Sequence, residues 1–187
     1  KSVNPTPVID KLAREGMLFE KSFCSNSICG PSRAVILSGK HSHKNGFMNN
    51  GNSFDWNQQI FPKILRKNGY QTALYGKSHL KGKPQGFDDW AVLPGQGLYY
   101  NPDMIFADGR RRIDGYCTDV VTDLAVNWLK DKRDKSKPFV MMVQHKAPHR
   151  NWMPALRHLD LYDDITIPEP PTLFDKWKDN APPARHQ

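Results

Sequence analysis

The stretch DWNQQIFPKILRKNGYQTALYGK, residues 55–77, predicts the fold class of this chain. Apolar residues recur at helical spacing over 55–69, and Gly69 is suited to the C-terminal cap of that helix. The following residues, 70–77, form a short apolar run that is typical of a buried strand and that ends in Lys77. A helix that leads directly into a buried strand is the repeating unit of α/β folds.

The same alternation of helices and short apolar strands continues on both sides of this stretch. It predicts an α/β fold with a mostly parallel central sheet flanked by helices. The chain opens on a loop and a helix without a first strand. We therefore expect residues 1–187 to be part of a larger domain, without an internal boundary, that lacks the domain's first strand and its C-terminal portion. The other elements expected are helices at 6–16, 31–39 and 119–134, strands at 17–25 and 137–145, and a small hairpin at 104–112 within a long loop region, 81–115.

The composition is that of a globular protein, with 38% hydrophobic and 25% charged residues. The formal net charge is +8, but the basic residues are scattered and no basic helix with interleaved aromatics is present, so we expect no nucleic-acid partner. The sequence contains no window of 18 consecutive apolar residues, so it predicts no membrane span. Three cysteines without a Cys-x-x-Cys pair predict neither a disulfide framework nor a zinc site of the usual spacing.

Unusual polar residues follow three of the expected strands. SICGPSR (27–33) follows the first, GKSHL (76–80) the second and QHKAPH (144–149) the third. Because ligands of open α/β sheets bind beyond the carboxyl ends of the strands, we expect these residues to share one pocket. The set is rich in cations and imidazoles around one candidate nucleophile, Cys29, which is expected just before a helix N-terminus. It lacks the features of a cysteine protease and favours a pocket for a compact anion.

Three motifs carry a resemblance to a known family. CGPSR (29–33), followed by LSGK (37–40), resembles the type I sulfatase signature Cys-x-Pro-Ser-Arg with its downstream Leu-Thr-Gly, except that Ser38 stands where threonine is usual. GKSHL (76–80) is similar to the second motif of that family, Gly-Lys-x-His-Leu, and APH (147–149) resembles its third site. The resemblance implies an alkaline-phosphatase-like sandwich.

The resemblance also implies roles for the matching residues. Cys29 would be oxidised to formylglycine (3-oxoalanine) by a formylglycine-generating or anaerobic sulfatase-maturing enzyme, and the hydrated aldehyde would be the nucleophile. Arg33 would stabilise the hydrate, and Lys77 would hold a sulfate oxygen. His79 would be the base of the elimination step, and His149 would lie near the leaving oxygen.

Further expectations concern the substrate contacts and the metal. We expect His145 and Trp152 to line the substrate pocket together with Lys77 and His149. The resemblance implies a divalent cation, Ca²⁺ or Mg²⁺, held by oxygen ligands. Position 29, as formylglycine, would be a ligand, and the remaining ligands are expected to be absent from this chain. Asp88-Asp89 and Asp163-Asp164 are interpreted as surface acids, and the fragment alone is expected to be inactive.

Two stretches, HKAPHRNWMP (145–154) and VLPGQGLYYNPD (92–103), resemble the carbohydrate-sulfatase branch near the N-acetylglucosamine-6-sulfatases. This implies a sulfate ester on a glycosaminoglycan or mucin-type glycan, with 6-O-sulfated N-acetylglucosamine as the candidate sugar. Such enzymes act in the periplasm, at the cell surface or in the lysosome, although no signal peptide is visible in this chain. Four polar or aromatic residues of the second stretch are expected to contact a sugar ring: Tyr99, Tyr100, Asn101 and Asp103.

Two alternatives stay open at this point. One is a phosphate or phosphonate ester hydrolase of the alkaline-phosphatase superfamily, which usually places Thr or Ser at the nucleophile position, unlike Cys29. The other is a catalytically silent glycan-binding relative, which an unmodified Cys29 would favour.

Overall fold

The computed structural model describes residues 4–175. These residues form two compact units. One unit consists of residues 21–153 and contains the sheet, and the other combines residues 4–20 with 154–175. None of the described helices is long and apolar enough to cross a membrane.

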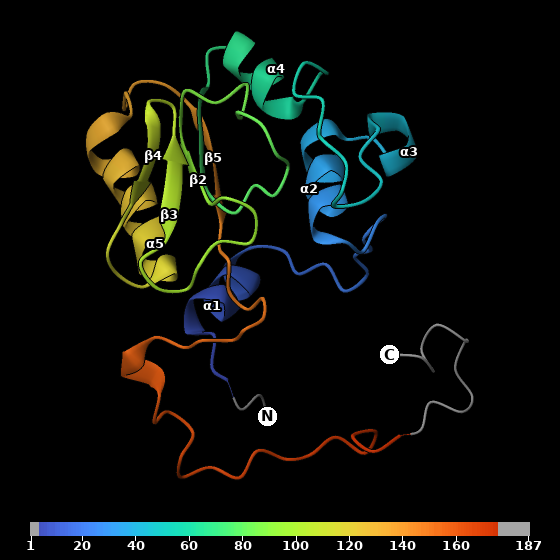
Figure 1. The fold of residues 1–187 in the computed structure, drawn as a ribbon, viewed down its shortest axis with the longest axis vertical. Helices are drawn as coiled ribbons and strands as arrows, with labels where there is room; N and C mark the ends of the chain where they lie inside the picture. The colour runs from blue at the N-terminus through green and yellow to red at the C-terminus, as the bar shows by residue number, and fades with distance from the viewer. Residues whose placement is uncertain (1–3, 176–187) are drawn as a thin grey trace. The chain divides into compact units, whose positions relative to one another are not determined.

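The larger unit is built on a mixed sheet of five strands in the order β4-β3-β2-β1-β5 (Figure 1). The central strand β1 pairs in parallel with β2 on one side and with β5 on the other. The hairpin formed by β3 and β4 extends the sheet antiparallel beyond β2. The strands are β1 (Gln71–Gly76), β2 (Asp89–Val92), β3 (Asp103–Phe106), β4 (Gly109–Arg112) and β5 (Phe139–Gln144). The predicted α/β class, with a parallel central part flanked by helices, is confirmed.

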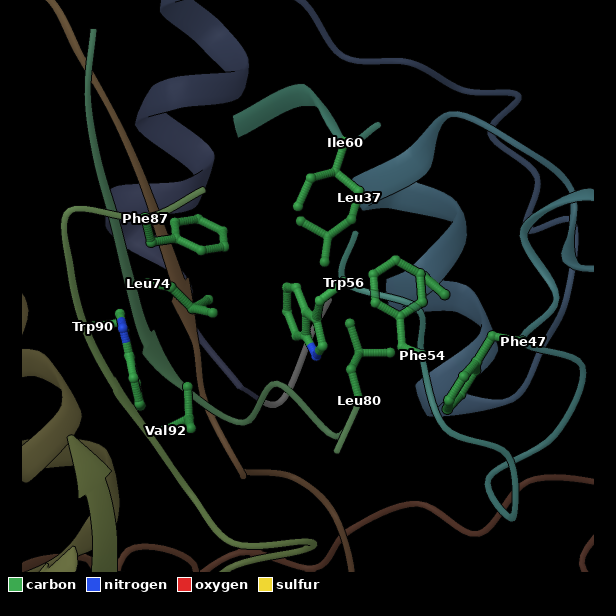
Figure 2. Packing of buried hydrophobic residues seen from close by; sticks show 11 residues of the cluster. Leu37, Phe47, Phe54, Trp56, Ile60, Leu74, Leu80, Phe87, Trp90 and Val92 are labelled. Carbon is green, nitrogen blue, oxygen red and sulfur yellow. The ribbon is translucent and has the colours of Figure 1, made fainter. Parts of the chain in front are cut away.

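Helices cover both faces of the sheet because β1 is apolar on both sides. Leu74 packs into a cluster with residues of α2 and with the long loops, whereas Ala73 and Tyr75 face a second cluster that contains α5. Figure 2 shows the first cluster, in which Trp56 and Phe54 lie between the sheet and α2. The helices of this unit are α2 (Cys29–Ser38), α3 (Ser42–Asn45), α4 (Phe61–Lys67) and α5 (Cys117–Asn127), which continues as a π-helical turn η1 (Trp128–Lys132).

The two edges of the sheet differ in character. The β4 edge carries three consecutive exposed arginines, Arg110 to Arg112. The β5 edge is apolar, and its residues Phe139 and Val143 are 40% and 37% exposed. The apolar run at 137–145 therefore forms the expected parallel strand, but in the described residues it lies at an edge rather than in the interior.

The smaller unit contains α1 (Pro7–Glu15) and a 3-10 turn η2 (Leu156–His158). Pro7 lies in the first turn of α1 as predicted, and the Thr6 hydroxyl donates to Asp10 Oδ1 at 2.8 Å. No residue of α1 is buried. Within this unit the Tyr162 hydroxyl donates to Asn4 Oδ1 at 3.0 Å.

Three expectations about local structure are wrong. The residues at 17–25 form no strand, and Phe19 and Phe23 are exposed, because no described strand pairs with them. The helix expected over 55–69 begins only at Phe61, since the Asp55 carboxylate accepts from the Asn57 backbone N–H at 2.8 Å and favours a turn instead.

The third error concerns the loop region at 81–115, which contains the strand β2 as well as the expected hairpin. The strand β2 is four residues long and is preceded by a segment rich in Gly, Pro and Asp. Such a short run carries too little periodicity to be predicted. Pairing with β1 is what makes it a strand.

Candidate active site

Cys29 is the first residue of α2 rather than a residue before it. The N-cap residue, Ile28, supplies no side-chain cap, and in the first turn the Gly30 N–H donates to Asn50 Oδ1 at 3.1 Å. The Cys29 thiol is half-buried, with its Sγ 3.1 Å from Nδ1 of His79 and 3.4 Å from Nδ2 of Asn50. The candidate nucleophile therefore lies in a region of positive helix-end potential and touches an imidazole.

Two cations from different elements lie beside this thiol. Lys77 directly follows β1, is 2% exposed, and donates its backbone N–H to the Gln144 carbonyl at 2.7 Å. Arg33, from the first turns of α2, donates Nη1 both to the Lys77 carbonyl and to Gln144 Oε1, the latter at 2.7 Å. These bonds tie α2 to the carboxyl ends of β1 and β5.

Burial and mutual repulsion destabilise the charged forms of Lys77, Arg33 and His79, so a bound anion would be favoured here. The pKa of Lys77 is lowered mainly by burial and further by Arg33 and Lys146, against the opposing effect of Cys29. Burial also lowers the pKa of Arg33. The pKa of His79 is lowered by burial first and then by the charges of Lys77 and Arg33. A compact anion placed here would offset this repulsion, so the electrostatics support the predicted anion pocket.

The third polar segment follows β5. Lys146 is buried, with its ammonium 4.6 Å from the centre of the Tyr99 ring. The Tyr99 hydroxyl donates to the backbone carbonyl of His149, and His149 Nδ1 lies 2.8 Å from the Arg150 carbonyl. The charge of His149 is close enough to lower the pKa of His79. This segment therefore reaches the same site as the first two.

The two remaining predicted residues, His145 and Trp152, differ in burial. His145 is half-buried, its Nδ1 has no hydrogen-bond partner among residues 4–175, and burial lowers its pKa. Trp152 is 71% exposed, and its backbone N–H donates to the His149 carbonyl at 3.4 Å. The structure thus joins Cys29, Arg33, Lys77 and His79 directly, with the other three residues on the segment beside them.

Sequence reasoning missed three residues that contact this group. Asn50 Oδ1 accepts the Gly30 backbone N–H at 3.1 Å, and Gln96 Nε2 lies 3.3 Å from Nε2 of His79. Gln144 is the third, through its bond to Arg33. The sequence offered one weak signal for these residues, the asparagine-rich run at 49–52. This run could not be distinguished from an ordinary turn, because asparagine is frequent in turns.

The residue between the cysteine and the proline of the first motif must be small in this chain. A Cβ added at Gly30 would lie 2.7 Å from Asn50 Oδ1 and 2.8 Å from Cε1 of Phe47. Glycine at this position therefore allows Asn50 to approach both the Gly30 N–H and the Cys29 thiol.

Three of the four residues expected to contact a sugar at 99–103 are engaged within the chain. Tyr99 is 4% exposed, Asn101 Oδ1 accepts the Gly115 N–H at 2.8 Å, and Asp103 is paired with Arg110 at 2.7 Å. These side chains hold their own loops and the hairpin, so their contact with a sugar stays a prediction.

A cavity of about 170 Å³ opens next to Asn50 and His79, with Val92, Leu93 and Ile105 in its wall. A larger cleft, of about 610 Å³, is lined by Lys63 and Lys67 of α4, by the loop before β2 and by Trp90 of β2. It contains none of the motif residues, so we locate the site by its chemistry rather than by the size of the opening.

The described residues do not by themselves fit a divalent cation. Among residues 4–175 no group of three or more His, Cys, Asp and Glu side chains could hold a metal ion. Asp88 is paired with Arg66 and accepts from Thr72, and Asp89 is paired with Lys132.

Comparison with known proteins places the chain among relatives of one kind. The family described as Sulfatase matches residues 1–181. The chain is 50% identical over 186 residues to the N-acetylglucosamine-6-O-sulfatase of Bacteroides thetaiotaomicron, covering 97% of this chain and 33% of that protein. It is 32% identical over 179 residues to the N-acetylglucosamine-6-sulfatase of Homo sapiens, covering 82% of this chain and 32% of that protein. The chain spans about a third of the length of these relatives.

Solved structures agree with the described fold. A protein in complex with its substrate D-glucosamine-2-N,6-O-disulfate superimposes with a TM-score of 0.94 at 50% identity, over 97% of this chain and 37% of that one. A phosphonate monoester hydrolase of Agrobacterium radiobacter reaches a TM-score of 0.53 at 18% identity, over 75% of this chain and 36% of that one. The second similarity shows a shared fold only, so the hydrolase alternative gains no functional support from it.

Proposed function

This chain belongs to the sulfatase family, and from that premise we propose that the protein hydrolyses a sulfate ester on a sugar, with 6-O-sulfated N-acetylglucosamine as the substrate. The observation that carries the proposal is the arrangement around Cys29, whose Sγ lies against His79 at the start of α2 beside Lys77 and Arg33. The two relatives named for 6-sulfated N-acetylglucosamine support the choice of sugar.

The thiol of Cys29 stands for the oxygen of a formylglycine that a maturation enzyme would install. When formed and hydrated, this group supplies one hydroxyl to attack sulfur and a second whose deprotonation releases sulfate. A plain serine or cysteine has no second hydroxyl and would stay sulfated.

The chain's own residues then have separable tasks. Lys77 holds a sulfate oxygen, and Arg33 stabilises charge at position 29 while its bonds to Lys77 and Gln144 fix its orientation. His79 Nδ1 faces position 29 and accepts a proton there. His149 donates a proton to the leaving sugar oxygen. The mostly buried setting strengthens each of these interactions relative to water.

Substrate contacts outside the sulfate pocket fall to the segment after β5. Trp152 presents an exposed indole on which a sugar ring can stack, and the buried Nδ1 of His145 has no hydrogen-bond partner within residues 4–175. The tyrosine hydroxyl bonded to the His149 carbonyl holds the segment in place.

The remaining parts of the proposal concern the complete protein. The family implies a divalent cation, Ca²⁺ or Mg²⁺, toward which the described residues offer only position 29. Sulfated glycans occur outside the cytoplasm, so we place the protein in the periplasm, at the cell surface or in the lysosome, with a sulfated carbohydrate and a maturation enzyme as partners.

The test combines mass spectrometry with an activity panel. The complete protein is produced with its maturation enzyme, and the tryptic peptide 22–33 is examined, with Cys24 in the same peptide as an internal unmodified thiol. Formylglycine at position 29 and sulfate release from a 6-O-sulfated sugar are expected. An unmodified Cys29 under these conditions, or activity confined to aryl phosphates, would contradict the proposal.

A further inference from the structure

The imidazole of His79 is held between two groups, one at each ring nitrogen. Its Nδ1 lies 3.1 Å from Cys29 Sγ, and its Nε2 lies 3.3 Å from the side-chain nitrogen of Gln96. Within residues 4–175, Gln96 is the hydrogen-bond partner of Nε2. Whether Nε2 carries the ring proton therefore depends on which end of the Gln96 amide, oxygen or nitrogen, faces Nε2.

The end of the Gln96 amide that faces away from His79 is buried and has no hydrogen-bond partner among residues 4–175, so no contact at that end fixes which way the amide points. With its nitrogen toward His79, the amide places an N–H donor on Nε2, which forces the ring proton onto Nδ1, against position 29. A base cannot accept a proton at a nitrogen that already carries one. A half-turn of the amide exchanges oxygen and nitrogen without moving the chain.

The backbone of Gln96 is fixed close to the end of β1, the strand that precedes His79. Gln96 lies in a tight turn in which the Gly97 N–H donates to the Pro94 carbonyl at 3.0 Å, with Gly95 at φ 54° and Gly97 at φ 67°. Both glycines adopt the left-handed region that other residues avoid. The turn follows Leu93, whose N–H donates to the Gly76 carbonyl at 2.9 Å at the end of β1.

We propose that Gln96 presents its amide oxygen to the Nε2–H of His79 and so holds the imidazole with the Nδ1 lone pair facing position 29. Gln96 is a positioning residue, because it acts through His79 and does not touch the reacting atoms. The inference rests on the proposed function, in which Nδ1 accepts the proton of a hydroxyl at position 29. In that transfer the O–H bond breaks, the proton binds Nδ1, and the electron pair stays on oxygen.

The first measurement reads the tautomer and needs neither substrate nor turnover. The complete protein is labelled with ¹⁵N-histidine, and the signals of His79 are those missing from a His79→Gln sample. In the parent protein we expect Nε2 to be protonated and Nδ1 to be unprotonated. In Gln96→Leu we expect this preference to be lost. A proton on Nδ1 of the parent protein would overturn the proposal.

The second measurement follows sulfate release with formylglycine verified in each sample. Gln96→Leu should lower kcat about tenfold or more with little change in KM, and Gln96→Glu should restore it, because a carboxylate presents only acceptor oxygens. Gln85→Leu is the matched control, since Gln85 lies in an exposed loop and bonds to Asn57. Equal kcat values for Gln96→Leu and Gln85→Leu would overturn the proposal.

The two measurements separate this inference from the proposed function. If the modified parent protein releases no sulfate from any sugar of the panel, the proposed function fails. The tautomer of His79 still decides whether Gln96 orients it.

Discussion

Two helices of this molecule begin at a cysteine, and their environments differ sharply. Cys29 opens α2 and Cys117 opens α5, each after an extended N-cap residue without a side-chain cap. The positive end of the helix dipole therefore lies at both thiols. Yet Cys29 is half-buried and touches His79, whereas Cys117 is 1% exposed within the cluster on the other face of the sheet.

The difference shows that a helix N-terminus does not by itself make a reactive group. Burial raises the pKa of the Cys117 thiol to about 11, with only a partial opposing effect from Lys146. At Cys29, the cations Lys77 and Arg33 and the imidazole of His79 surround a position that a ligand can reach. The two sites differ in what surrounds the thiol: cationic and imidazole side chains at Cys29, and a buried apolar cluster at Cys117.

The largest contrast is expected when each cysteine is removed. Cys29→Ala should reduce sulfate release by a factor of about 10⁴ or more, because the precursor of the nucleophile is lost. Cys117→Ala should leave kcat unchanged and cost about 1 kcal/mol of stability, since it removes a small buried side chain. Activity assays and urea unfolding of both variants measure the two effects. Substantial activity in Cys29→Ala would refute the assignment of the nucleophile.

Removal of a lysine charge should lower kcat/KM only when the lysine lies at the α2 site. Lys77→Met should lower kcat/KM about 10²- to 10³-fold, since a buried group that stabilises transition-state charge is lost. Lys132→Met, which breaks the exposed pair with Asp89, serves as the matched control and should leave kcat/KM unchanged. Steady-state kinetics on a 6-O-sulfated sugar decide the point, and similar values for both variants would exclude a role for Lys77 in the reaction.

Alkaline pH should destabilise the folded state through the α5 cysteine, alongside three tyrosines whose pKa values burial also raises, Tyr75, Tyr99 and Tyr116. The folded-state pKa of Cys117 is raised from 9.0 to about 11, so the folded state keeps a proton that the unfolded state releases. The free energy of unfolding therefore falls as pH rises from about 9 to about 11, and the Cys117 contribution to this fall is roughly 2–3 kcal/mol. Unfolding of the parent protein is compared with that of Cys117→Ala across this window. Identical pH profiles would show that Cys117 does not titrate as expected.

The smallest contrast concerns the second residue of each helix. Gly30→Ala should cost about 1–3 kcal/mol, because the added methyl group meets Asn50 and Phe47 at less than 3 Å. Thr118→Ala, at the corresponding position of α5, should change stability by about 0.5 kcal/mol or less. Thermal unfolding of both variants tests this, and an unchanged Tm in Gly30→Ala would show that the Asn50 loop moves aside freely.

Local patterns in the sequence predicted the elements that hold the motifs. The helix and strand periodicity located β1 and α5, and the three motifs converge at one site as expected, although among the described residues only the second and third follow a strand. These features were predictable because the order of strands and the direction of parallel pairing determine where their carboxyl ends meet. The catalytic roles themselves stay predictions, to be decided by the experiments above.

The amide residues could not have been found in the same way. Asn50 reaches the thiol across 21 positions and Gln96 reaches His79 across 17, and both lie in loops whose composition is that of ordinary turns. The expected strand at 17–25 failed for a related reason. Apolar residues favour a strand only where a neighbouring backbone completes the ladder.

The unequal edges of the sheet have a consequence for handling the protein. Arginines along β4 discourage pairing with a further chain, because like charges would meet across the new ladder. The strand β5 itself carries no charged side chain, and its residues Phe139 and Val143 are partly exposed, although the Arg133 guanidinium stacks over the Phe139 ring at one end. We expect a sample of residues 1–187 alone to self-associate through β5, and Val143→Lys to reduce the association measured by size-exclusion chromatography.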